Sequence, residues 1–152
     1  GEVTKTGAQL ISFDFEYSGE LNEFILALSC QAVALSARSS QTRQVTEELY
    51  RNLKAMAEAQ DDEAYFDADY RFHKAFFDYC GNRFLKETYK RYNLIRFLLM
   101  RHAVRTLEHR TSSIRQHRLI TEAYEDGDYK LAEKLTEEHY RYGVHLIDGE
   151  PD

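Results

Sequence analysis

The chain has 152 residues, 43% of them hydrophobic and 30% charged, and its formal net charge is −6. This length suits one domain with a substantial core, and the composition is ordinary for a soluble globular protein. Because no run of Lys or Arg interrupts the acidic background, the sequence lacks the basic face that contacts to nucleic-acid phosphates require. No apolar stretch approaches the length of a membrane span and no signal peptide opens the chain, so we expect a cytoplasmic protein without a membrane partner.

Helix-forming residues fill long stretches of the sequence, because its one proline, Pro151, lies close to the C-terminus. Ahead of these stretches, apolar residues alternate with polar ones from Ile11 to Tyr17, and this period of two favours a strand or an extended linker over residues 1–17. Ser18 is suited to cap a first helix, whose apolar positions recur from Leu21 to Leu35. We therefore predict a helical domain over residues 18–147 and a C-terminal tail over residues 148–152.

Local signals mark the helices that follow. Apolar positions from Val45 to Met56 predict a second helix. The acidic pair Asp61-Asp62 suits the positive end of a third helix, which Gly81 is suited to end. Asn82 can then cap a fourth helix. These signals predict an almost entirely helical fold.

The fourth helix is apolar nearly all round over its segment Leu94–Met100. Such a helix lies either at the centre of a domain or at an interface, and its excess of apolar surface predicts a homodimer. A fifth helix is expected from about Ser112 to Glu125. Gly127-Asp128 supplies a terminator and a cap, and a sixth helix continues to about His145.

The two cysteines, Cys30 and Cys80, both occupy apolar helical positions. Neither forms a CxxC motif, and a single well-separated pair does not make a disulfide framework. We expect both to be buried free thiols.

One aspartate and three histidines interrupt apolar helical stripes. Asp69 and His73 lie four residues apart on one stripe, while His117 and His139 lie on two others. Polar groups that point inward are costly unless they are paired, hydrogen-bonded or bound to a metal. Imidazole nitrogen and carboxylate oxygen together suit borderline divalent cations, so the pattern predicts one metal site, with zinc or nickel as first candidates and manganese or iron as others.

Other interpretations of this pattern stay open. A single core histidine commonly bonds a backbone carbonyl, and Asp69 and His73 can pair with each other. The chain would then be a helical dimerisation module without a metal. A mononuclear hydrolase is a further alternative, because a metal with an open position can activate water, although no general base is evident near the four residues. A di-iron protein would need Glu-x-x-His pairs, which the sequence lacks.

Several segments, taken in order, are more specific than any one alone. They are Asp69-Tyr70-Arg71-Phe72-His73, Gly81-Asn82-Arg83-Phe84-Leu85, His117-Arg118-Leu119-Ile120, Gly127-Asp128 with Ala132, and finally His139. Over roughly residues 18 to 146 the chain resembles the metal-containing type of the FadR C-terminal (FCD) domain. That domain is the effector-binding half of bacterial GntR-superfamily transcription regulators.

The resemblance implies an antiparallel bundle of six or seven helices in which Asp69, His73, His117 and His139 bind a divalent metal on the floor of a pocket. It also implies that a small carboxylate effector completes the metal's coordination, so the domain is expected to be a sensor and not an enzyme. DNA binding in this family belongs to an N-terminal winged helix-turn-helix, for which residues 1–17 leave no room. The start Gly1-Glu2-Val3, without an initiator Met, leads us to expect a fragment of a longer regulator.

The chain departs from the family in its first helix. Members usually carry an Arg there, followed one turn later by Glu, whereas the corresponding positions here are Ile25 and Ser29. Arg96 and Arg101, on the fourth helix, are the nearest substitutes for the arginine that grips the effector, although either can equally be a solvated or interface residue. Aromatic residues such as Phe72 would crowd the site, which favours small hydroxy- or dicarboxylic acids such as lactate, malate or citrate.

Overall fold

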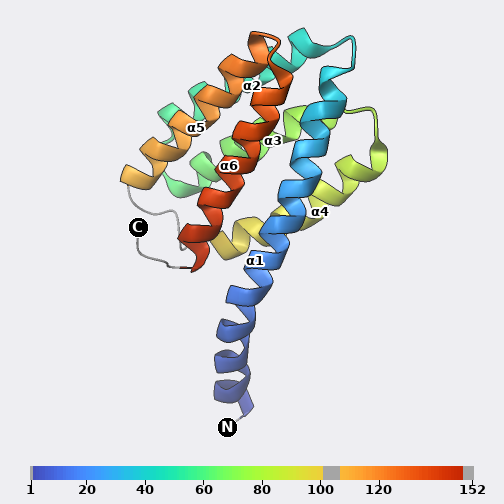
Figure 1. Cartoon of the computed structure of the whole chain (residues 1–152). Helices are drawn as coiled ribbons and strands as arrows, with labels where there is room; N and C mark the ends of the chain where they lie inside the picture. The colour runs from blue at the N-terminus through green and yellow to red at the C-terminus, as the bar shows by residue number, and fades with distance from the viewer. Residues whose placement is uncertain (1, 101–106, 149–152) are drawn as a thin grey trace.

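The computed structural model describes residues 2–100 and 107–148, and side chains within residues 16–98 and 109–142. The described residues form six helices and no strand, which confirms the all-α prediction. The helices are α1 (Glu2–Ala37), α2 (Thr42–Glu58), α3 (Asp62–Asp78), α4 (Arg83–Met100), α5 (Leu107–Glu125) and α6 (Tyr129–Asp148). Helix α6 packs between α1 and α5, while α3 contacts α1, α2 and α4 (Figure 1).

Helix α1 is longer than the sequence pattern indicated. It begins at Glu2 and continues through Ser18, which is buried within the helix and does not cap it. The predicted strand or extended segment over Ile11–Tyr17 is therefore wrong. A lone alternating segment has no neighbouring strand for its N–H and C=O groups, whereas a helix pairs them within the segment. The N-terminal part of α1 projects beyond the bundle in Figure 1, and a domain boundary after residue 17 stays a prediction.

The predicted cap of α4 is confirmed, and Asp61, which was predicted to lie at the positive end of α3, caps that helix. The Asp61 side chain accepts a hydrogen bond from the Ala64 N–H at 2.8 Å. Asn82 Oδ1 accepts from the N–H groups of Phe84 and Leu85, each at 3.0 Å. Because the first N–H groups of a helix have no partner within it, these side chains fix where α3 and α4 begin.

A glycine turn separates α5 from α6. Gly127 has a φ of +78°, and its N–H bonds the Tyr124 carbonyl at 3.1 Å, while the N–H of Asp128 bonds the Ala123 carbonyl at 3.0 Å. This pair of bonds is the Schellman arrangement, in which a left-handed residue satisfies the last carbonyls of a helix. Helix α5 begins at Leu107, earlier than the predicted Ser112.

The core is rich in aromatic rings. Phe77 stacks on Tyr89 with ring centroids 4.0 Å apart.

Helix α4 is not central, because Leu94 and Leu98 keep 62% and 50% of their surface exposed. None of the described helices is long and apolar enough to cross a membrane. Both cysteines are free thiols, with Cys80 buried and Cys30 half-buried.

Candidate metal centre

Three helices bring the four predicted ligands together. Asp69 and His73 lie one turn apart on α3, His117 comes from α5 and His139 from α6. One ligand atom from each side chain can be chosen so that all four atoms lie within 4.8 Å of one another. The bundle thus brings together residues that are far apart in the sequence, because each lies on the apolar face of its helix and these faces pack against one another in the core.

The spacing of these atoms suits a shared ion. His117 Nε2 lies 2.8 Å from Asp69 Oδ1 and 3.1 Å from His73 Nε2, and His73 Nε2 lies 3.5 Å from Asp69 Oδ1. Two ligand atoms each about 2.1 Å from one divalent ion are about 3.0 Å apart at a right angle and about 3.4 Å apart at a tetrahedral angle. The residues present therefore fit a metal in both donor type and separation.

Burial sets the protonation of the centre. His73 and His117 are almost fully buried, and 14% of the Asp69 side chain is exposed. Burial lowers the pKa of His73 to about 4, despite the opposing effect of Asp69. Burial also lowers the pKa of His139 well below its usual value, and the charges of His117 and His73 act in the same direction.

The Asp69 carboxyl behaves differently. Burial by itself raises its pKa, but hydrogen bonds from His117 and His73 outweigh burial and hold the pKa well below the usual value. At neutral pH the centre thus offers a carboxylate together with the neutral imidazoles of His73 and His139. Metal coordination requires these protonation states.

Two of the imidazoles have a partner on the side away from the centre. His117 Nδ1 lies 2.6 Å from the Ser113 carbonyl oxygen, and His139 Nδ1 lies 2.6 Å from Gln116 Oε1. A carbonyl oxygen can only accept, so in both rings Nδ1 carries the hydrogen. Such contacts orient imidazoles in metal sites and leave Nε2 for the metal.

Arg96, one of the two predicted effector-binding residues, lies beside the centre. It is 6% exposed, and its Nη1 is 4.0 Å from Asp69 Oδ2. Its Nε donates to Asn22 Oδ1 at 3.1 Å, and its guanidinium carbon lies 4.9 Å from the centroid of the Tyr140 ring. A fourth helix, α4, thus contributes a buried cation to the site. The other candidate, Arg101, lies outside the described residues.

Sequence reasoning missed a polar stripe on α1. Asn22, Ser29 and Ser36 are spaced seven residues apart and are all buried. Asn22 Nδ2 donates to the Tyr140 carbonyl at 2.7 Å, and Ser29 Oγ donates to the Tyr140 hydroxyl at 3.0 Å. A heptad of small polar residues within an apolar helix face was the available signal. The sequence around Gln116 gives no such signal, because what sets this residue apart is its contact with His139 on α6, which only the structure shows.

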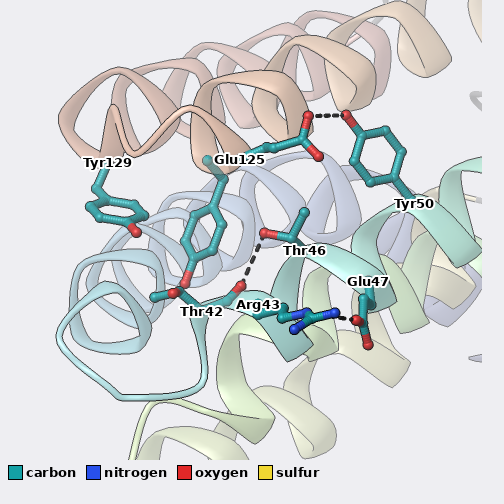
Figure 2. A pocket seen from close by; sticks show the side chains of 8 residues that line it. Thr42, Arg43, Thr46, Glu47, Tyr50, Glu125 and Tyr129 are labelled. Carbon is teal, nitrogen blue, oxygen red and sulfur yellow. Dashed lines mark hydrogen bonds and ion pairs between the residues drawn. The ribbon is translucent and has the colours of Figure 1, made fainter.

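A separate hollow of about 620 Å³ lies among α2, α5 and the start of α6 (Figure 2). Its polar groups largely satisfy one another: the Tyr50 hydroxyl donates to Glu125 at 2.9 Å, and Arg43 pairs with Glu47 at 3.4 Å. None of the four clustered ligands lines it. This hollow is therefore distinct from the candidate metal centre.

A partly buried aspartate and three buried histidines meet within a helical bundle, and comparison with known proteins identifies the family. The family model of the FCD domain matches residues 20–142. The chain therefore belongs to the FCD domain family.

One solved structure with the same fold is the metal-free FCD domain of TM0439, a proposed transcriptional regulator. It shares 23% sequence identity with this chain, the match covers 93% of each chain, and the TM-score is 0.58. At this identity the similarity shows the fold. No curated protein matches the chain significantly.

Proposed function

We propose that this FCD domain is the effector sensor of a GntR-superfamily transcription regulator, and that it binds one divalent metal through Asp69, His73, His117 and His139. The convergence of these four side chains from three helices supports the proposal most directly. Without a metal, three imidazoles would crowd one carboxylate in a buried space. Zinc and nickel are the first candidates, because both accept mixed nitrogen and oxygen donors.

The charge of the centre indicates the effector. A divalent ion and the Arg96 guanidinium bring three positive charges close to the single negative charge of Asp69. A buried excess of positive charge favours an anion. A small acid could complete the metal's coordination with one carboxylate and approach Arg96 with a second oxygen group, since a guanidinium is shaped for carboxylates. Lactate, malate and citrate have this chemistry.

The same arrangement suggests how binding could be relayed. The proposed metal ligands come from α3, α5 and α6, and Arg96 comes from α4. An effector that contacts both the metal and Arg96 would therefore favour one packing arrangement of these four helices over others. In the full regulator this change would reach a separate winged-helix domain that contacts DNA. The exposed Leu94 and Leu98 on α4 suit a homodimer interface.

A hydrolase is supported less well. Glu137 is adjacent in sequence to the ligand-bearing segment, but its carboxylate pairs with Arg141 at 2.7 Å and is 44% exposed. A general base must lie within reach of a metal-bound water, and this pairing directs Glu137 to the surface. We therefore favour the sensor.

The test compares metal-loaded and metal-free protein by calorimetry with lactate, malate and citrate. We expect at least one acid to bind the loaded form and raise its melting temperature, with no effect on the metal-free form. Arg96→Leu should weaken that binding about tenfold or more while metal content stays unchanged. Equal binding of the acids with and without metal would refute the sensing mechanism, and the absence of metal from zinc- or nickel-treated protein would refute the metal site.

A further inference from the structure

The three clustered imidazoles differ in the hydrogen-bond partner of Nδ1, the ring nitrogen that faces away from the centre. His117 is held by the Ser113 carbonyl, which belongs to the backbone of its own helix. His73 Nδ1 is buried and has no hydrogen-bond partner. Among the Nδ1 atoms of these three described rings, only that of His139 contacts a side chain from another helix, Gln116 on α5, at 2.6 Å.

This contact determines which ring nitrogen of His139 keeps a lone pair that a metal ion could bind. Gln116 Oε1 can only accept, so His139 Nδ1 must carry the hydrogen, and the lone pair of the neutral ring then resides on Nε2. If the Gln116 amide were turned the other way, its NH₂ group would donate to Nδ1 and the lone pair on that nitrogen would be used up. The orientation of one amide thus selects between two tautomers of His139.

The location of Gln116 adds a second consequence. Gln116 is half-buried and immediately precedes His117, so one short stretch of α5 supplies a ligand and also contacts a ligand on α6. No substitution of a side chain can remove the Ser113 carbonyl that holds His117, whereas the contact to His139 can be removed by changing one residue.

We propose that Gln116 is a positioning residue of the metal centre: it accepts the Nδ1–H of His139, fixes the ring in the Nδ1–H tautomer and keeps Nε2 available for the ion. The proposal rests on the proposed function of the cluster as a metal site. Residues that orient ligating histidines in this way typically change metal affinity by about 10- to 100-fold when they are removed.

The first experiment reads the tautomer directly in metal-free protein. Long-range ¹H–¹⁵N spectra of the ¹⁵N-labelled chain at pH 7.5 distinguish Nδ1–H from Nε2–H rings. We expect the Nδ1–H form for His139 in the wild type, loss of that preference in Gln116→Leu, and its return in Gln116→Glu, whose carboxylate can accept the same hydrogen. An Nε2–H ring in the wild type, or an unchanged tautomer in Gln116→Leu, would overturn the proposal.

The second experiment measures zinc affinity by competition with a chromophoric chelator. Gln116→Leu should bind zinc about 10- to 100-fold more weakly, and Gln116→Glu should lie within about threefold of the wild type. Gln31→Leu is the matched control, because Gln31 is an exposed mid-helix glutamine on α1, and it should bind like the wild type. Rescue by Glu separates positioning from a general loss of folding, and equal affinity of Gln116→Leu and wild type would overturn the proposal.

The two experiments also separate this proposal from the one it rests on. If the wild-type chain binds no zinc or nickel, the proposed function fails, but the tautomer of His139 in metal-free protein still decides the role of Gln116. If the wild type binds zinc and Gln116→Leu binds it equally well with the same tautomer, only the role of Gln116 fails.

Discussion

Replacing His117 by Ala should remove the metal from the centre. His117 is fully buried, and its Nε2 lies within 3.1 Å of both His73 Nε2 and Asp69 Oδ1, so it joins the two ligands of α3 to the rest of the cluster. We expect metal affinity to fall at least tenfold, which corresponds to about 1.4 kcal/mol or more.

The same substitution should also destabilise the metal-free protein. It leaves a cavity where the ring packed against Phe72, at a centroid distance of 4.6 Å, and it deprives the Ser113 carbonyl of the hydrogen bond from His117 Nδ1. Cavity formation and an unsatisfied buried acceptor together cost about 2–4 kcal/mol. For a domain of this size the melting temperature should fall by roughly 4–16 °C.

A control variant separates loss of metal from loss of stability. Leu49→Ala removes a fully buried side chain from α2 and should cost about 2–5 kcal/mol, but Leu49 is not one of the four ligands, so the variant should retain wild-type zinc content. Elemental analysis after dialysis, followed by chelator competition, compares the two variants. Full metal content in the double variant His117→Ala with His139→Ala would show that the ion binds elsewhere and would refute the ligand assignment.

Four further results are expected. The metal-free protein should lose stability as the pH falls from 6.5 toward 4, because burial holds the pKa of His73 at about 4 and the histidine is therefore protonated in the unfolded chain before it is protonated in the folded one. The loss is about 1.4 kcal/mol per pH unit in that window. Equal unfolding free energies at pH 7 and pH 5 would contradict this expectation. Metal-loaded protein should lose its extra stability over the same range, since protons compete for the imidazoles, and melting curves of the loaded and metal-free forms should converge by about pH 5. Cys30, whose pKa is raised to about 12 by burial and by Glu133 and Glu137, should react with iodoacetamide far more slowly in the folded than in the denatured chain, which mass spectrometry of timed samples can check. Replacing Leu94 and Leu98 by Glu should leave the melting temperature nearly unchanged but shift light-scattering mass toward a monomer, and a wild-type monomer at high micromolar concentration would remove the dimer hypothesis.

Features that depend on residues close in the sequence could be predicted without a structure. The caps at Asp61 and Asn82 and the glycine turn at Gly127 act over five residues or fewer, so the chain determines them locally. The candidate ligands could be chosen for a similar reason. A polar residue within an apolar helical stripe must point inward wherever its helix packs, as His73 and His117 do.

The extent of α1 was decided by competition between two local structures. An alternating pattern from Ile11 to Tyr17 is compatible with a strand, but a strand needs a partner, and the described residues supply none. The helix needs no partner for its backbone and continues directly into the residues that pack against α6. The hydrophobic periodicity alone does not show whether a strand would find a partner for its backbone, because it reflects the order of side chains and not the hydrogen bonds of the backbone.

The partners around the centre were decided by tertiary structure alone. Arg96 and Leu94 lie two residues apart on α4, yet one is buried against Asn22 and Tyr140 while the other is mostly exposed. Which of them faces the core depends on how α4 is rotated about its axis, and packing against α1 and α3 sets that rotation. The contact between Gln116 and His139 likewise depends on how far α5 and α6 slide past each other. The sequence by itself determined that His73, His117 and His139 point inward from their helices, but only the packing of the helices determined which groups they meet there.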